Sequence, residues 1–210
     1  MLGTILRIAV LASGRGSNFQ AIIDGIKEKE IDCEIAVLIT DNPEAKAIER
    51  AKENNIHVEI VDPKLFKNRE EMDKKIKQIL DKNNVRLVVL AGYMKIIKSK
   101  ELLDAYQGRI INIHPSLLPA FKSSIRAQQD AFNYGCMVSG LTIHLVTSDV
   151  DGGAIIYQEA VDISDCKTGD EAAAKILKCE HKAYRKVVAS FAYGAYGVTG
   201  KRASFIYYPI

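Results

Sequence analysis

One short stretch, residues 110–116 with the sequence IINIHPS, decides the expected fold and carries its candidate chemistry. Its apolar start is typical of a buried strand, and Pro115 ends the hydrogen-bonding ladder of that strand. Side chains two apart on a strand share a face, so Asn112 and His114 should point the same way. Open α/β sheets present their functional groups in this manner, at the carboxyl edge. The alternative is a strand end whose polar groups only cap a turn.

Four apolar segments precede this strand, and helical patterns separate them. The segments cover residues 6–12, 34–40, 57–61 and 86–91. Their near-continuous apolar character is typical of parallel strands that are covered on both faces. Helices are predicted after the glycine-rich residues 13–18, from the start signal Asn42-Pro43-Glu44, and over residues 69–82 and 99–106. The predicted fold class is α/β: a doubly wound, mostly parallel open sheet with helices on both faces.

The second half of the chain has a different pattern. Residues 138–146 and 154–161 alternate in part, which predicts longer strands and an antiparallel element near one edge of the sheet. Residues 168–191 predict a long helix, and residues 205–208 predict a terminal strand. No linker or repeat divides the chain, so a single domain over residues 1–210 is expected.

The bulk composition excludes several classes of protein. A net charge of +3 with 26% charged residues is too mild to indicate a nucleic-acid partner. No apolar run approaches the length of a membrane span, so no membrane partner is expected. The four cysteines are scattered, without the spacing of a metal site, and should be free thiols in a reducing cytosol. We therefore expect a cytoplasmic protein without a metal ion.

Residues 13–18, SGRGSN, form a glycine-rich turn between the first strand and its helix. Such a turn exposes backbone N–H groups and the positive end of the helix dipole to an anion. Phe19 replaces the third glycine of the dinucleotide fingerprint, and no P-loop lysine follows. A single terminal phosphate is therefore the better ligand. The alternative is a tight turn without a ligand.

A third candidate group lies in the loop between the two late strands. If the sheet brings this loop over His114, the carboxylate of Asp151 raises the pKa of the imidazole and orients it. Asp149 competes for this role, and an ordinary turn aspartate is the alternative. His144 lies inside a strand and is interpreted as a packed or supporting histidine. An amide, a protonatable histidine and an aspartate predict acyl transfer through a tetrahedral intermediate.

Four stretches resemble one family, the phosphoribosylglycinamide formyltransferases of purine biosynthesis. They are residues 10–18 (VLASGRGSN), 90–94 (LAGYM), 112–119 (NIHPSLLP) and 151–153 (DGG). The NIHPSLLP and DGG motifs indicate the folate-dependent formyltransferase superfamily, and SGRGSN narrows it to the glycinamide ribonucleotide branch. The resemblance covers nearly the whole chain and implies a Rossmann-like fold.

The resemblance also implies a reaction. The amine of glycinamide ribonucleotide would attack the formyl carbon of 10-formyltetrahydrofolate, which serves as a co-substrate. Asn112 would polarise the formyl oxygen and hold the oxyanion. His114, protonated, would stabilise the intermediate and act as a general acid. Asp151 would raise the pKa of His114 and help to pass the proton from the amine to the folate nitrogen.

Two binding regions follow from the same resemblance. The implied ribonucleotide contacts are Gly16, Ser17, Asn18 and Glu180. The implied folate contacts are Arg69, Met94, Lys95, Ile96, Ile97 and Asn112. The N-terminal half would bind the phosphate and the ribonucleotide, and the C-terminal half would bind the folate and catalyse the transfer. The expected partners are small-molecule substrates, with the chain acting as a monomer or a homodimer.

The chain departs from the family pattern after Pro119, where an aromatic residue and Pro-Gly usually follow. Residues 121–126 read FKSSIR instead, and the loop is one residue longer. The loss of proline and glycine changes the allowed backbone, so substrate closure or affinity should differ. The chemistry is expected to persist because Asn112, His114 and Asp151 remain.

Other functions compete with this interpretation. A methionyl-tRNA formyltransferase would need an added basic domain, for which the chain has no room. A formyltetrahydrofolate hydrolase would carry an extra N-terminal domain, whereas the first strand begins within the first few residues here. A phosphate-binding module with an inactive site is disfavoured by the intact Asn112, His114 and Asp151. A pyridine-nucleotide oxidoreductase is disfavoured by the missing third glycine of the turn.

Overall fold

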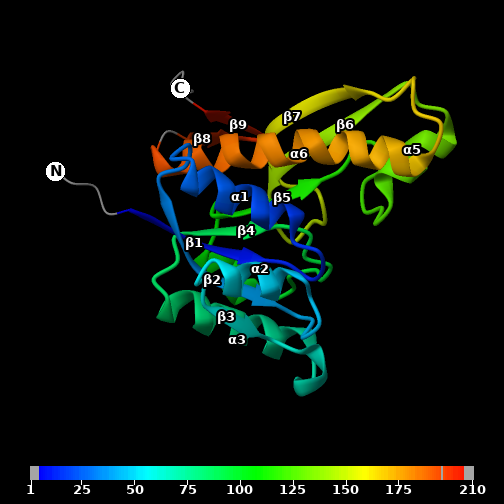
Figure 1. The fold of residues 1–210 in the computed structure, drawn as a ribbon. Helices are drawn as coiled ribbons and strands as arrows, with labels where there is room; N and C mark the ends of the chain where they lie inside the picture. Colours follow the sequence, from blue (N-terminus) through cyan, green and yellow to red (C-terminus); the bar gives the residue numbers. More distant parts are fainter. Residues whose placement is uncertain (1–4, 195, 206–210) are drawn as a thin grey trace.

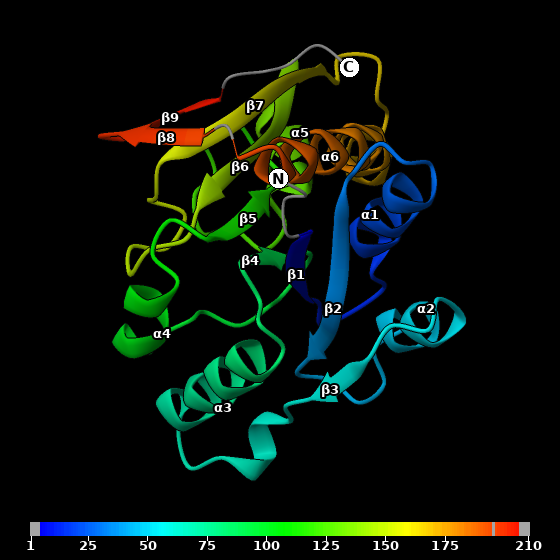
Figure 2. The ribbon, with the colours of Figure 1, turned by 90° about the vertical axis from the view of Figure 1, so that its left-hand side faces the viewer.

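The computed structural model describes residues 5–194 and 196–205. Their strands form one sheet in the order β3-β2-β1-β4-β5-β6-β7-β9-β8 (Figures 1 and 2). The strands are β1 (Leu6–Leu11), β2 (Cys33–Thr40), β3 (Val58–Ile60), β4 (Leu87–Leu90), β5 (Ile110–His114), β6 (Val138–Leu145), β7 (Ile155–Asp162), β8 (Tyr196–Thr199) and β9 (Arg202–Phe205). Neighbours from β3 to β5 are parallel, whereas β6 is antiparallel to both β5 and β7. The predicted mostly parallel sheet with an antiparallel element is confirmed.

Helices cover both faces of the sheet (Figure 1). They are α1 (Ser17–Lys27), α2 (Ala47–Glu53), α3 (Arg69–Lys82), α4 (Lys100–Ala105), α5 (Ala127–Tyr134) and α6 (Gly169–Ala192), with a short 3-10 turn at Pro63–Leu65. Helices α1, α2, α5 and α6 share one apolar cluster with the sheet, in which Phe19 and Tyr184 are fully buried. Helices α3 and α4 share a second cluster, which contains Met72 and Leu102. Each face of the sheet is thus covered by its own core.

Side-chain caps explain where two of the helices begin. The side chain of Asn68 accepts a hydrogen bond from the backbone N–H of Glu71 at the start of α3. The Thr168 hydroxyl does the same for Glu171 at the start of α6. These caps satisfy N–H groups that have no partner within the helix. The bounds of both helices agree with the predicted ones to within a residue.

Some local predictions differ from the structure. Asn42 does not start a helix: its side-chain oxygen accepts the N–H of Glu44 at 3.0 Å, and its amide donates to the carbonyl of Ser13 at 3.2 Å. These bonds close a turn, and α2 begins only at Ala47. Helix α5 and strand β8 have no counterpart among the predicted elements. The predicted strand 205–208 lies outside the described residues, apart from the final residue of β9.

The topology brings three chain segments to the carboxyl edge of the parallel strands. The turn after β1, the segment after β4 and the end of β5 are neighbours there, because β1, β4 and β5 are adjacent and parallel. A backbone hydrogen bond of 3.1 Å from Ser13 to Gly92 joins the first two. Every helix in the described part of the chain is too short or too polar to cross a bilayer.

Candidate active site

The end of β5 places Asn112 beside a second histidine. The register of β5 and β6 sets Asn112 directly opposite His144. The side-chain nitrogen of Asn112 lies 3.3 Å from Nε2 of His144. Nδ1 of His144 lies 2.9 Å from the carbonyl oxygen of Leu145, so Nδ1 carries the proton that this acceptor requires. Nε2 of the same ring faces both the Asn112 amide and a carboxylate oxygen of Asp151, so it can accept from the amide or, when it carries a proton, donate to the carboxylate.

Asp151 lies between the two histidines. Its Oδ2 is 3.4 Å from Nδ1 of His114, and its Oδ1 is 3.5 Å from Nε2 of His144. The side chain of Asp149 is instead 63% exposed, and its Oδ1 lies 2.9 Å from Nζ of Lys122. The structure therefore brings Asp151, and not Asp149, against His114.

His114 is buried, yet both of its ring nitrogens face acceptors. Nδ1 faces Asp151, and Nε2 lies 3.0 Å from the carbonyl oxygen of Phe121. Burial lowers the pKa of His114 below the usual value for histidine, although the Asp151 charge and the Phe121 carbonyl act in the opposite direction. The increase expected from Asp151 is thus present but outweighed. When His114 is protonated, it gives up its proton more readily than a free histidine does, which suits a proton donor.

Asp151 supplies the negative charge of this cluster. Burial acts to raise the pKa of Asp151, but a hydrogen bond to His144, the backbone N–H of Ser123 and the charge of His114 together hold that pKa below its usual range. The Ser123 N–H donates to Oδ2 over 2.9 Å. The carboxylate is therefore ionised at neutral pH and can stabilise positive charge on His114.

The glycine-rich turn after β1 leads into α1, as predicted. Gly16 precedes the helix with a φ of 67°, and a β-carbon there would lie 2.8 Å from that of Ala47. Both the backbone and the packing against α2 therefore require glycine at this position. Ser17 and Asn18 are the first residues of α1. The backbone N–H groups of a first helical turn lack helical partners and favour an anion.

Glu180 reaches the same place from α6. Its Oε2 accepts a hydrogen bond of 2.8 Å from the amide of Asn18, and the residue is only 5% exposed. Burial raises the pKa of Glu180, and the Asn18 hydrogen bond acts against this rise. The residues predicted to contact a ribonucleotide thus lie together where α1 meets α6.

An irregular stretch follows β4 over residues 93–99, and we call it the 93–99 segment. It contains four of the predicted folate contacts, residues 94–97, whereas Asn112 lies on the neighbouring strand β5. The N–H of Met94 donates to the hydroxyl of Ser13 over 2.9 Å, which joins the segment to the glycine-rich turn. The side chains of Met94 and Ile96 are 59% and 53% exposed. Ile97 is only 4% exposed and packs into the core, which leaves its backbone as the part open to a ligand.

Arg69 supports this segment from α3. Its Nε donates to the carbonyl of Ile96 over 2.8 Å, and its Nη2 lies 3.2 Å from the hydroxyl of Tyr93. The guanidinium also lies over the Tyr93 ring, 5.6 Å from its centre. Lys95 is held more loosely, with Nζ 4.0 Å from a carboxylate oxygen of Asp41. Arg69 thus binds the protein itself, beside the place where a folate is expected.

Two contributions to the site were not predicted in detail. His144 contacts both Asn112 and Asp151 and thereby supports them. These contacts depend on the pairing of β6 with β5, which the sequence pattern does not indicate. Phe121 and Ser123 contact the central groups through their backbones, with φ values of 55° and 64°. The departure of residues 121–126 from the family pattern drew attention to this loop, but it did not indicate that the backbone of the loop contacts His114 and Asp151.

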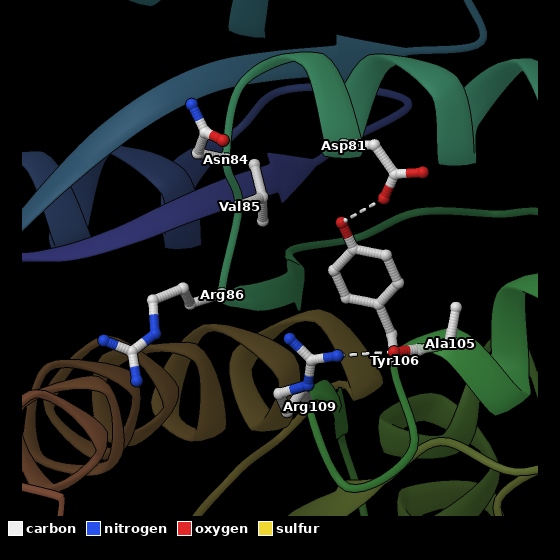
Figure 3. Close-up of a pocket in the computed structure, with 7 residues that line it drawn as sticks. All are labelled: Asp81, Asn84, Val85, Arg86, Ala105, Tyr106 and Arg109. Carbon is white, nitrogen blue, oxygen red and sulfur yellow. Dashed lines mark hydrogen bonds between the residues drawn. The ribbon is translucent and has the colours of Figure 1, made fainter.

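A separate cavity of about 430 Å³ lies at the opposite, amino edge of β4 and β5 (Figure 3). It is lined by Asp81, Asn84, Val85, Arg86, Ala105, Tyr106 and Arg109, none of which is a predicted site residue.

Among residues 5–194 and 196–205, no group of three or more histidine, cysteine, aspartate or glutamate side chains is arranged to hold a metal ion.

Comparisons with known proteins agree with this geometry. Residues 6–188 match the Formyl transferase family model, and the chain belongs to that family. It is 44% identical over 182 residues to the phosphoribosylglycinamide formyltransferase of Bacillus subtilis, covering 87% of this chain and 92% of that protein. Within the family, the chain is therefore one of the phosphoribosylglycinamide formyltransferases.

More distant relatives and solved structures point the same way. The human trifunctional purine biosynthetic protein adenosine-3 is 38% identical over 178 residues, which are 85% of this chain and 17% of that longer protein. The crystal structure of glycinamide ribonucleotide transformylase 1 from Symbiobacterium toebii superimposes with a TM-score of 0.92 at 39% identity. That match covers 96% of this chain and 94% of the other, so the two chains share the fold over nearly all of their length.

Proposed function

We propose that this site transfers the formyl group of 10-formyltetrahydrofolate to the amine of glycinamide ribonucleotide, a step of purine biosynthesis. The observation that carries the proposal is the contact of Asp151 with His114, beside Asn112 at the end of β5. These three groups supply an oxyanion donor, a proton donor and a fixed charge, which an acyl transfer through a tetrahedral intermediate requires.

The reaction balances with these groups alone. The amine nitrogen forms a bond to the formyl carbon, and the carbonyl electron pair moves onto oxygen, where the Asn112 amide stabilises it. The negative oxygen next to His114 favours the imidazolium, which burial otherwise disfavours. The amine then loses its proton, which Asp151 helps to pass toward the folate nitrogen, and His114 protonates that nitrogen. The electron pair on oxygen restores the carbonyl bond as the bond from carbon to the folate nitrogen breaks, and its electrons stay on the departing nitrogen. Asp151 stabilises the charged histidine throughout.

The two substrates would meet at these groups, one held by the glycine-rich turn and the other by the 93–99 segment beside it. Gly16, Ser17 and Asn18 would hold the ribonucleotide phosphate at the start of α1, with Glu180 contacting the rest of that substrate. Arg69 and residues 94–97 would border the folate, through backbone groups and the exposed side chains of Met94 and Ile96. Asn112 would touch the formyl group and thereby belong to both sides.

The wider assignment follows from the same proposal. One domain over residues 1–210 would act on small molecules in the cytoplasm as a monomer or a homodimer, without a metal ion. The expected division into a ribonucleotide-binding and a folate-binding half does not fit these contacts. The N-terminal half would bind the phosphate and also border the folate through Arg69 and residues 94–97, whereas the C-terminal half would supply the catalytic groups and Glu180.

Turnover with both substrates tests the proposal. We expect tetrahydrofolate to be released when 10-formyltetrahydrofolate and glycinamide ribonucleotide are both present, and not when the ribonucleotide is left out. Release without the amine would indicate a hydrolase instead. No release from the folded protein in either case would contradict the proposal and favour a binding module.

A further inference from the structure

Asp73 is a fully buried carboxylate that the proposed mechanism does not use. It lies on α3 with a side chain that is 0% exposed. Its Oδ2 accepts two backbone hydrogen bonds, from Lys98 over 2.6 Å and from Ser99 over 3.0 Å. A buried charge is unfavourable unless it is paired and hydrogen-bonded, so its partners indicate what it is for. Both of these N–H groups belong to the 93–99 segment.

The other oxygen of Asp73 faces Arg69. Oδ1 lies 3.4 Å from Nε of Arg69 but has no hydrogen bond, because the single Nε–H is directed to the carbonyl of Ile96. The attraction to Oδ1 therefore acts by charge alone. Asp73 thus holds the end of the 93–99 segment directly and its middle through the guanidinium of Arg69.

The 93–99 segment needs such support because it belongs to no helix or strand. Its N–H and carbonyl groups have no ladder to join, so side chains must satisfy them. Ser99 also caps α4, its hydroxyl accepting the N–H of Leu102 over 3.3 Å. The cap therefore ties the end of the segment to the first turn of α4.

We propose that Asp73 is a positioning residue for the folate: by binding the N–H groups of Lys98 and Ser99 and the charge of Arg69, it holds the backbone and the apolar side chains of the 93–99 segment in the geometry that receives the folate ring. The inference rests on the proposed function of this segment. Asp73 itself touches no substrate, because it has no exposed surface.

Kinetics of both substrates test this role. If Asp73→Ala lowers the population of the ordered segment to about a tenth, the apparent affinity for the folate falls in proportion. We expect the KM for 10-formyltetrahydrofolate to rise about tenfold, with the KM for glycinamide ribonucleotide within about twofold of wild type and kcat largely kept. Calorimetric binding of tetrahydrofolate should weaken by the same factor.

Asp73→Asn keeps the shape and serves if the alanine variant does not fold. Its amide oxygen can still accept from the backbone, but its NH2 group faces the Arg69 cation, so we expect an intermediate rise of about threefold in folate KM and tetrahydrofolate Kd. Asp81→Asn is the matched control. Asp81 is on the same helix but bonds the Tyr106 hydroxyl over 3.0 Å at the cavity of Figure 3. It should leave both KM values unchanged.

Two results would overturn the inference. One is a folate KM and a tetrahydrofolate Kd that stay at wild-type values in the folded Asp73→Asn variant. The other is an equal rise in both KM values, which would indicate a general loss of structure. A wild-type protein without turnover would instead contradict the proposed function, and tetrahydrofolate binding would still report on Asp73.

Discussion

The two sides of the active site are held in place by different means. Asn112 and His114 belong to β5, which has a hydrogen-bonded neighbour on each side, β4 and β6. The 93–99 segment has no such ladder and is held by the side chains of Ser13, Arg69 and Asp73. A ladder distributes its support over many backbone bonds, whereas the segment depends on a few side chains. Substitutions of polar side chains on the strand should therefore lower kcat, and those beneath the segment should raise the KM for the folate.

The largest effect is expected on the strand side, from His114→Ala. The proton donor is lost while the β5 ladder is kept, so kcat should fall by roughly two to four orders of magnitude. Steady-state turnover at saturating concentrations of both substrates measures this loss, with circular dichroism as the control for folding. Near-wild-type turnover would remove His114 from the mechanism.

Asn112→Ala should follow with a loss of roughly two to three orders of magnitude in kcat, the scale of one oxyanion donor. The same assay measures it. Asn112→Asp is the matched variant: it has a similar shape but no N–H donor, and it should not restore turnover. Activity of Asn112→Asp close to wild type would show that the amide donor is not needed.

Asp151→Asn should change the pH dependence of the reaction. The carboxylate raises the pKa of His114 against the effect of burial, so its removal lowers that pKa further. Protonated His114 is then lost at a lower pH, and the descending limb of kcat/KM against pH should move to lower pH than in wild type. A descending limb that stays in place or moves to higher pH would show that Asp151 does not raise the pKa of His114.

Ser13→Ala should give the smallest effect and lies on the segment side. It removes the acceptor for the N–H of Met94. One hydrogen bond of about 0.5–1.5 kcal/mol corresponds to a rise of about two- to tenfold in the KM for the folate. Initial rates at varied folate concentration measure it. A fall in kcat as large as that of Asn112→Ala, with an unchanged KM for the folate, would contradict the expectation that substitutions beneath the segment affect folate binding rather than turnover.

The strand side was largely predictable from the sequence. The period of two places Asn112 and His114 together, and the proline after them marks the strand end. Spacing alone could not choose between Asp149 and Asp151, because both lie in one short loop, and only the resemblance of the DGG motif favoured Asp151. Asp151 has a φ of 51°, and such backbone geometry, which turns one carboxylate inward, depends on packing rather than on residue type.

The support of the 93–99 segment could not be predicted for a related reason. Asp73 lies on a helix with a clear apolar stripe, where its burial is not indicated by the periodicity. Its partners are backbone groups 25 and 26 residues away. Only the packing of α3 beside α4 brings these groups together, and a pattern of residue types carries no information about such backbone partners.

Transfer of a carbon-13-labelled formyl group tests the central claim most directly. Labelled 10-formyltetrahydrofolate is mixed with glycinamide ribonucleotide and either the wild-type protein or His114→Ala, and the products are analysed by mass spectrometry. We expect wild type to place the label on the amine of the ribonucleotide, one label per tetrahydrofolate released, and His114→Ala to do so at a small fraction of that rate. Label recovered as free formate, or equal transfer by both proteins, would contradict this claim.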